Sequence, residues 1–165
     1  MSKSLLIIGA GGHGQVVKEV AEALGYDEIA FLDDNSSKSI GKIADSQKFV
    51  KEYEYAFVGI GNNKFRNELL QRLEREGFEI PALLHPTAYI SKTAVIGKGT
   101  VVEPKAIVNA NSRVGLGCII SVGAIVDHDV VLEDCVHVNA GAICKAGSFV
   151  AKETKLEAGQ VVKGY

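Results

Sequence analysis

Residues 95–148 read VIGKGT-VVEPKA-IVNANS-RVGLGC-IISVGA-IVDHDV-VLEDCV-HVNAGA-ICKAGS, a run of hexapeptides with an apolar residue at the second position of each. The spacing continues on both sides, and only Cys144, a residue type that buries well, interrupts the aliphatic set. A period of six fits neither an α-helix nor a hairpin sheet. It is typical of a parallel β-helix, in which short strands and turns stack coil on coil around inward rows. The aliphatic positions are Leu84, Ile90, Ile96, Val102, Val108, Val114, Ile120, Val126, Leu132, Val138, Val150, Leu156 and Val162.

The residues that directly follow the inward positions are expected to form the corners of the coils. They are repeatedly of types that tolerate a positive φ or a tight turn, namely Gly97, Asn109, Gly115, Asp127 and Asn139. Phe149 is the only aromatic residue between Ile90 and Gly164, as expected for a narrow column filled by Val, Ile and Leu. An ordinary β-sandwich is the alternative, but the unbroken series of six-residue intervals argues against it.

The composition of the 165 residues is that of a soluble globular protein, with 47% hydrophobic and 23% charged residues. The net charge of −2, with acids and bases interspersed, predicts neither a nucleic-acid partner nor a membrane surface. The apolar run Leu5 to Ile8 is too short for a signal peptide or a membrane span, so a cytoplasmic protein is expected. Cys118, Cys135 and Cys144 are odd in number and lack C-x-x-C spacing, which predicts neither disulfides nor a metal site.

The first half predicts a small unit of strands and helices, with domain boundaries at 1–82 for this unit and 83–165 for the β-helix. Such alternation describes a parallel sheet of the doubly wound type, which binds ligands at the carboxyl ends of its strands. Gly77 should cap the second helix, and Pro81 and Pro86 bracket the passage into the repeats. The expected strands are 4–9, 28–32, 55–60 and 79–84, and the expected helices are 15–24 and 63–76.

The turn after the first strand carries a glycine motif. Gly9, Gly11 and Gly14 match G-x-G-x-x-G, and an acid follows about 24 residues later. By spacing alone this turn could bind a dinucleotide, and a glycine turn without a ligand is the alternative. Because only one mononucleotide-sized half is present, a nucleoside diphosphate sugar fits better than NAD, and a dehydrogenase is the weakest alternative.

Four motifs occur in order: G-A-G-G-H-G at 9–14, F-L-D-D at 31–34, G-I-G-N at 59–62 with Arg66 behind it, and D-H-D at 127–129. With a Rossmann-like unit followed by hexapeptide coils, the chain resembles, over nearly its whole length, the sugar-nucleotide acetyltransferases of the bacillosamine, perosamine and sialic acid O-acetyl type. The resemblance implies a left-handed β-helix, acetyl-CoA and a nucleotide sugar as substrates, and a homotrimer with sites where adjacent columns meet. The outward, apolar Phe149 suits a subunit contact.

His128 is the expected catalytic residue. It lies two positions after inward Val126, at an expected corner, so its imidazole should point outward. A lone histidine is more often structural, but Asp127 and Asp129 flank this one, and a carboxylate bonded to an imidazole fixes its tautomer and raises its basicity. Acetyl transfer needs a base, for which we expect His128 oriented by Asp129, and an oxyanion donor, for which backbone N–H groups of a neighbouring coil are expected.

The resemblance implies further roles. The cofactor side would include His137, at a family position near the acetyl-CoA thioester, and Ser121, which stands where the family commonly has Asn, seven residues before the catalytic histidine. Arg66 could stabilise phosphate charge or form an exposed ion pair. The substrate side would place the glycine turn near the phosphates, the acids near the base or ribose, and the third strand end beside them, through Gly12, His13, Gly14, Asp33, Asp34, Gly61 and Asn62.

Three functions stay open on these residues. The first is acetyl-CoA-dependent N-acetylation of a nucleotide-linked amino sugar, with His128 as the base. The second is O-acetylation of a sugar hydroxyl, and the third is a non-catalytic protein that binds a nucleotide sugar. The sequence reaches Tyr165 one to two coils before the end of many relatives, whose further coils often line the cofactor, so acetyl-CoA affinity stays open as well.

Overall fold

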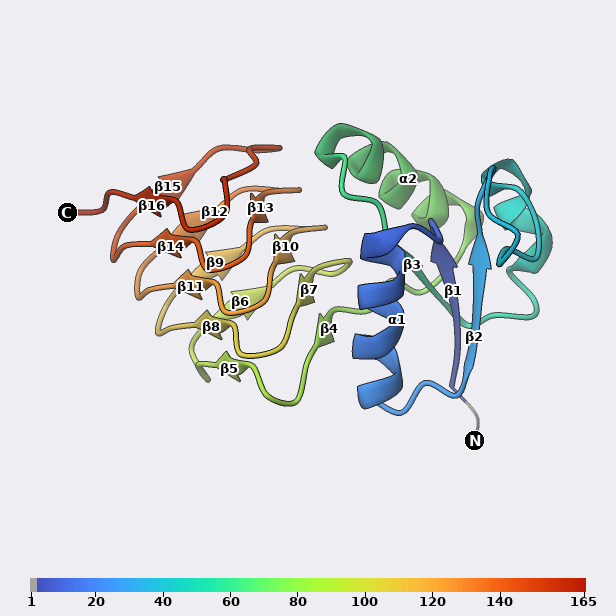
Figure 1. The fold of residues 1–165 in the computed structure, drawn as a ribbon, viewed down its shortest axis with the longest axis horizontal. Helices are drawn as coiled ribbons and strands as arrows, with labels where there is room; N and C mark the ends of the chain where they lie inside the picture. The colour runs from blue at the N-terminus through green and yellow to red at the C-terminus, as the bar shows by residue number, and fades with distance from the viewer. Residues whose placement is uncertain (1–2) are drawn as a thin grey trace. The chain divides into compact units, whose positions relative to one another are not determined.

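A computed structural model describes residues 3–165, and the chain divides after Pro81 into two compact units. The first unit holds a parallel sheet in the order β2-β1-β3 (Figure 1). Central β1 is buried throughout because it pairs with a strand on either side. The elements are β1 Ser4–Ile8, α1 Gly12–Ala23, β2 Glu28–Leu32, the 3-10 helix η1 Ile43–Phe49, β3 Tyr55–Val58 and α2 Asn63–Glu76.

The prediction of a fourth strand over 79–84 is wrong. Glu79 makes only an isolated bridge to Tyr55, while Leu83–Leu84 forms β4 of the second unit. Pro81 lies between them and has no N–H to donate to a strand ladder, which explains the interruption. The first helix also begins earlier than expected, at Gly12, so that the end of the glycine motif is helical.

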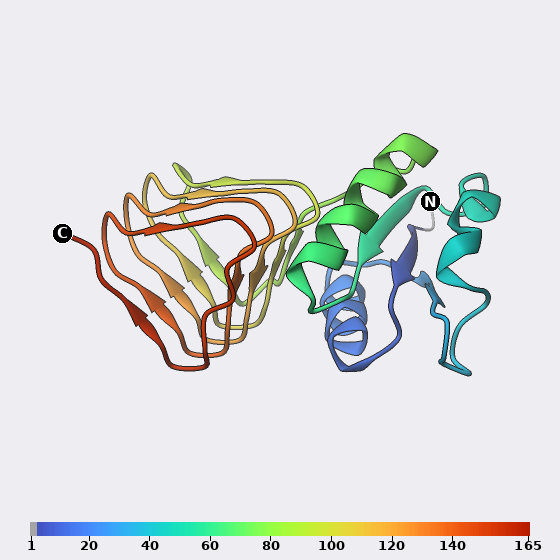
Figure 2. The same ribbon diagram turned by 90° about the horizontal axis from the view of Figure 1, so that it is seen from above.

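The second unit is a stack of two-residue strands that form three parallel sheets, confirming the parallel β-helix. We call these sheets the first face (β4, β7, β10, β13), the second face (β5, β8, β11, β14, β16) and the third face (β6, β9, β12, β15). Figure 2 shows the coils as stacked triangles. The strands are β4 Leu83–Leu84, β5 Tyr89–Ile90, β6 Val95–Ile96, β7 Val101–Val102, β8 Ile107–Val108, β9 Arg113–Val114, β10 Ile119–Ile120, β11 Ile125–Val126, β12 Val131–Leu132, β13 His137–Val138, β14 Ile143–Cys144, β15 Phe149–Val150 and β16 Val161–Val162.

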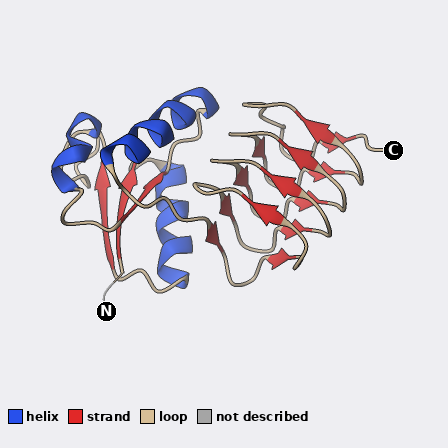
Figure 3. Cartoon of the chain, turned by 180° about the vertical axis from the view of Figure 1, so that it is seen from behind, coloured by secondary structure: helices blue, strands red, loops and turns tan. Residues whose placement is uncertain are grey.

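The predicted inward row forms the core of this unit. Its middle members, from Val102 to Leu156 and including Cys144, are nearly inaccessible, and Leu84, Ile90, Ile96 and Val162 pack against them at the two ends. Within residues 3–165 the helices lie in the first unit, and the second consists of strands and loops (Figure 3). The column is therefore a rigid support whose outward side chains lie in rows, one residue per coil.

The corners differ from expectation. Positive φ occurs three residues after the inward residue rather than directly after it. Gly97 and Gly115 serve a different purpose, since a Cβ on Gly97 would lie 2.4 Å from the carbonyl oxygen of Gly115 on the next coil. The positive φ values belong to Gly99, Lys105, Asn111, Gly117, Gly123, Asp129, Cys135, Gly141, Gly147, Glu153 and Gly159.

Candidate active site

His128 and Asp129 lie in the corner that joins β11 to β12, between the second and third faces. Asp129 has a left-handed backbone conformation with a φ of 58°. Its Oδ2 lies 2.7 Å from Nδ1 of His128, and the two side chains are 45% and 46% exposed. The imidazole is thus on the outside of the column with its Nδ1 side held by a carboxylate.

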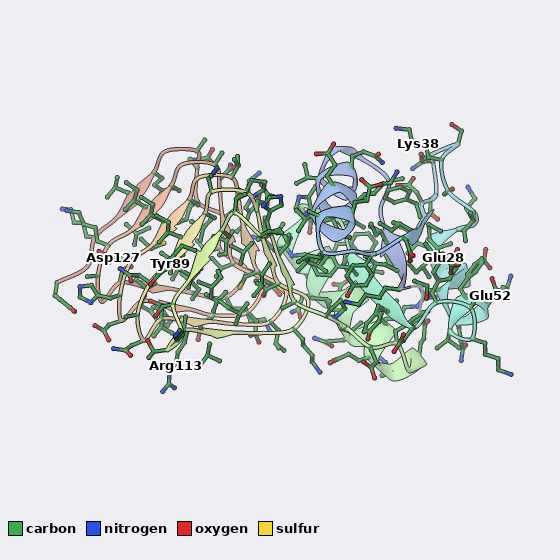
Figure 4. The ribbon with its side chains drawn as sticks, turned by 90° about the horizontal axis from the view of Figure 1, so that it is seen from below. Glu28, Lys38, Glu52, Tyr89, Arg113 and Asp127 are labelled. Atoms are coloured by element: carbon green, nitrogen blue, oxygen red, sulfur yellow. The ribbon has the colours of Figure 1, made fainter. Side chains whose placement is uncertain are left out.

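Polar side chains of the preceding coil hold both neighbouring carboxylates. Asn109 Nδ2 donates to Asp127 Oδ1 over 3.1 Å, and Asn111 Nδ2 donates to Asp129 Oδ1 over 3.3 Å. The same Asp127 oxygen accepts the backbone N–H of His128 over 2.7 Å. The two aspartates that flank the histidine therefore have different tasks, because Asp127 fixes its backbone and Asp129 its ring. Figure 4 labels Asp127 on the coils of the column.

The electrostatics of this corner favour a base. The hydrogen bond to Asp129 raises the pKa of His128 above 6.5, and the charges of Asp127 and Asp129 act in the same direction. The hydrogen bond from His128 in turn holds the pKa of Asp129 below its ordinary value. When Nδ1–H donates to the carboxylate, Nε2 carries the lone pair and can take a proton from a reacting group.

Ser121 and His137 are brought together elsewhere on the column. Ser121 is 6% exposed, and its hydroxyl lies 3.0 Å from Nε2 of His137. Ser121 lies in the corner between the first and second faces, and His137 is the outward residue of β13 on the first face. Ser121 thus lies at one end of β11, in the corner between the first and second faces. The His128–Asp129 pair lies at the other end of β11, in the corner between the second and third faces.

The glycine turn places the start of α1 at the carboxyl end of β1. Gly14 is buried, and a Cβ there would lie 2.0 Å from the carbonyl oxygen of Gly9, so it allows the helix to pack on the strand. Gly12 is exposed, and a Cβ there would meet nothing within 4 Å. Because the first N–H groups of a helix have no partner within it, this exposed turn is suited to an anion such as a phosphate.

His13 and Arg66 lie beside this turn. Burial, with a contribution from the Arg66 charge, lowers the pKa of His13 to about 4, so the imidazole is neutral at pH 7. Arg66 is fully buried and donates from Nη1 to the carbonyls of Ile60 (3.0 Å) and Gly61 (3.2 Å). Nη2 donates to Asn63 Oδ1 over 2.6 Å. The alternative of an exposed ion pair at Arg66 is therefore wrong, and its guanidinium instead holds the segment that follows β3.

Asp33 and Asp34 end β2 but differ in exposure. Both oxygens of Asp33 are engaged, Oδ2 by the backbone N–H of Ala10 (2.8 Å) and Oδ1 by those of Asn35 (2.8 Å) and Ser36 (2.9 Å). These bonds, that from Ala10 first, lower the pKa of Asp33. Asp34 is exposed and accepts the N–H of Ile43 through Oδ1 over 3.1 Å. Asp33 thus ties β2 to the glycine turn, and Asp34 is the more accessible acid.

The third part of this edge is the segment after β3. Gly61 is exposed, with nothing within 4 Å of where its Cβ would be. Asn62 is the N-cap of α2, because its Oδ1 accepts the backbone N–H of Phe65 over 2.9 Å. The carboxyl ends of all three strands therefore bring the glycine turn, the acids and this segment to one edge of the sheet, as parallel strands must.

Three side chains near His128 were not expected from the sequence, namely Asn109, Asn111 and Tyr165. The sequence does contain a pattern from which they could be found. Each strand pairs with the strand three hexapeptides further along the chain, so residues one coil apart lie in a row. Reading the outward positions in such rows, as well as the inward ones, places Asn109 beside Asp127, and Asn111 and Tyr165 in the row of Asp129.

Two further observations concern other kinds of site. Within residues 3–165, no group of three or more His, Cys, Asp or Glu residues is arranged to hold a metal ion. In that same range no helix combines the length and apolar character needed to cross a membrane.

Comparisons with known proteins agree with this arrangement. Residues 4–73 match the family model described as the PglD N-terminal domain. The UDP-N-acetylbacillosamine N-acetyltransferase of Bacillus subtilis (strain 168) is 32% identical over 111 residues, which cover 61% of this chain and 51% of that protein. The match thus spans about half the length of this curated relative.

Solved structures match over almost the whole chain. The acetyltransferase domain of PglB from Neisseria gonorrhoeae FA1090, in complex with acetyl coenzyme A, is 37% identical with a TM-score of 0.93, covering 99% of this chain and 83% of that one. A mutant of perosamine N-acetyltransferase from Caulobacter crescentus, in complex with CoA and GDP-perosamine, is 27% identical with a TM-score of 0.90, covering 98% and 89%.

Proposed function

Because the chain belongs to the left-handed β-helix, hexapeptide-repeat family of sugar-nucleotide acetyltransferases, we propose that it transfers an acetyl group from acetyl-CoA to the amino group of a nucleotide-linked amino sugar. The observation that carries the proposal is the His128–Asp129 pair, which is held on an outer edge of the column with Nδ1 of the ring engaged. The solved relatives bind acetyl coenzyme A, or CoA with GDP-perosamine, which supports the two substrate classes.

The proposed reaction needs one proton acceptor. The sugar amine attacks the thioester carbonyl, a C–N bond forms, and the C–S bond breaks as the oxyanion collapses. Nε2 of His128 takes the proton that the amine loses and passes it to the departing CoA thiolate. Asp129 stabilises the imidazolium formed on the way, since its carboxylate already accepts the Nδ1–H.

The first unit would hold the sugar nucleotide at the carboxyl edge of its sheet. The backbone at the start of α1, where Gly12 is exposed and His13 partly buried, would face the phosphates, and Gly14 allows the close packing of this turn on β1. His13 would act as a neutral hydrogen-bonding group, because its pKa is about 4. Asp34, rather than the fully engaged Asp33, is the better candidate for the ribose or base.

On the same edge, the exposed Gly61 and Asn62 would contact the sugar nucleotide. Arg66 would hold the backbone of this segment in place through its hydrogen bonds to the carbonyls of Ile60 and Gly61. On the column, the bonded Ser121–His137 pair would contact acetyl-CoA. Ser121 is shorter than Asn, and its hydroxyl is already engaged by His137, so the pair would act together rather than as two separate contacts.

We propose a homotrimer on the basis of two apolar strips. The second face carries an outward ladder of apolar side chains, Tyr89, Ile107, Ile125, Ile143 and Val161. The third face carries the exposed Val95, Val131 and Phe149 in its outward row, with the exposed Arg113 between Val95 and Val131. A closed ring of identical subunits needs two different complementary surfaces on each, and these two strips flank the edge that bears His128. Assembly through them would place the base at a subunit boundary.

The test is acetyl transfer with a matched control. Purified protein is incubated with acetyl-CoA and a panel of UDP- and GDP-linked 4-amino sugars, and thiol release is followed. His128→Ala should lower kcat by roughly 10²- to 10⁴-fold, the range of a lost general base. His85→Ala, which removes a histidine from another edge of the same column, should stay close to wild type. Product NMR distinguishes N- from O-acetylation, and the absence of turnover on every sugar nucleotide tested would reject the proposal.

A further inference from the structure

Tyr165 lies in the same row as Asp129, two coils further along the column. Asp129, Gly147 and Tyr165 each follow by four residues the outward residue of a second-face strand, and these strands pair in register through Ile125, Ile143 and Val161. Gly147 therefore separates Tyr165 from Asp129. A residue with a side chain at position 147 would fill the space between them, and glycine leaves it open.

The tyrosine ring occupies that space. A Cβ on Gly147 would lie 2.0 Å from Cε1 and 2.1 Å from Cδ1 of Tyr165, so the ring packs directly on the glycine backbone. A second glycine makes the approach possible, because a Cβ on Gly164 would lie 1.8 Å from the carbonyl oxygen of Ala146. The backbone N–H of Tyr165 donates to that same oxygen over 3.3 Å.

The hydroxyl end of the ring reaches the proposed base. It lies 3.5 Å from Nδ1 of His128, and the two ring centroids are 6.3 Å apart. The hydrogen bonds from His128 and Asn111 lower the pKa of Asp129, and the nearby hydroxyl of Tyr165 acts in the same direction. Donors from two coils, His128 and Asn111, thus bind this carboxylate, and the Tyr165 hydroxyl from a third coil lies beside the same pair.

We propose that Tyr165 is a positioning residue for the base: its hydroxyl donates to Asp129 and holds the carboxylate against Nδ1–H of His128, with Gly147 as the seat of its ring. The inference deepens the proposed function, on which its catalytic part rests. Tyr165 is 87% exposed, so it contributes little to the stability of the column, and its removal tests positioning rather than folding.

The experiment compares two variants that disturb the contact in different ways. Tyr165→Phe keeps the ring on Gly147 and removes only the hydroxyl. Gly147→Ala displaces the ring and also places a side chain at a φ of 71°. Gly159→Ala is the matched control, because Gly159 has a φ of 70° and nothing within 4 Å of where its Cβ would be.

The first readout is the NMR titration of the His128 ring, which needs no turnover. The charged groups that act on this ring are Asp129 and Asp127. Without the tyrosine, the carboxylate is held less firmly against Nδ1–H and the hydrogen bond that raises the pKa of His128 weakens, so the titration midpoint should move to lower pH in Tyr165→Phe and Gly147→Ala, but not in Gly159→Ala. A wild-type midpoint in the first two variants would overturn the proposal.

The second readout is kinetic. In Tyr165→Phe we expect kcat to fall by roughly 3- to 10-fold, with KM for acetyl-CoA nearly unchanged, because a looser carboxylate weakens proton transfer rather than binding. The double variant Tyr165→Phe/Gly147→Ala should fall little further than Gly147→Ala alone. Unchanged kcat in an active Tyr165→Phe enzyme contradicts the inference. A shifted midpoint in a protein that acetylates no sugar nucleotide rejects the proposed function and leaves the positioning contact supported.

Discussion

The charge on Asp129 decides the pH at which His128 can act as a base. Its hydrogen bond raises the pKa of His128, and the base is competent only above that pKa, so kcat/KM should rise with pH through it. Asp129→Asn keeps an oxygen for Nδ1–H but removes the charge. The pKa of His128 then falls, and the acidic limb of the profile moves to lower pH.

The same change lowers the plateau of kcat/KM, by roughly 10- to 100-fold, since a neutral amide stabilises the imidazolium less and can flip to present its N–H₂ group. The measurement is kcat/KM from about pH 5 to pH 9. Asp127→Asn should move the limb in the same direction with a smaller loss of plateau, because Asp127 acts on the ring through its charge alone. A limb that moves to higher pH in Asp129→Asn would contradict this account of the pair.

Individual residues show how far the sequence leads. The flanking carboxylates and the corner position predict an outward, oriented imidazole at His128, because these depend on neighbours in the chain. The neutral state of His13 and the burial of Arg66 could not be predicted, because both depend on how α1, α2 and the segment after β3 pack together. The sequence predicts that Arg66 lies near the glycine turn, but only the structure shows that its guanidinium donates to backbone carbonyl oxygens.

The corners of the coils carry two kinds of glycine, which predict two different costs for the same substitution. Gly159→Ala introduces a side chain at positive φ in open space and should lower the free energy of unfolding by about 1 kcal/mol. Gly97→Ala has no φ penalty, but its Cβ would lie 2.4 Å from a backbone oxygen of the next coil. Because backbone atoms in a stacked column cannot move aside singly, it should cost roughly 2–4 kcal/mol.

Urea unfolding followed by circular dichroism measures both variants. Equal losses, or a larger loss in Gly159→Ala, would show that the stacking distance does not govern the corners. The distinction is not available from residue types, since glycine serves both positive φ and close approach. The hexapeptide period therefore predicts the inward row and the existence of corners, while the position of the left-handed residue within each corner needs coordinates.

At the scale of the whole molecule, the outward rows matter as much as the inward one. The period predicts that every outward residue has a partner one coil away, so an apolar outward row becomes a continuous strip. The ladder on the second face is such a strip, and its middle residues Ile107, Ile125 and Ile143 are partly buried within the chain, whereas Tyr89 and Val161 are 59% and 50% exposed. A contiguous apolar strip of this kind on a protein surface indicates an interaction surface.

We therefore predict that a charge in either strip dissociates the proposed trimer and abolishes activity with it. Ile125→Glu lies at the middle of the second-face ladder and Phe149→Glu on the third face, and each places an unpaired carboxylate in a contact that burial would make costly. Leu116→Glu, in the exposed corner between the third and first faces and outside both outward rows, is the control and should assemble as the wild type does. Sedimentation at micromolar concentration measures the oligomeric state, and thiol release measures the acetyltransferase activity. A monomeric wild type, or a trimer that survives both strip variants, would contradict the placement of His128 at a contact between subunits. The active site would then have to be formed by residues of a single chain.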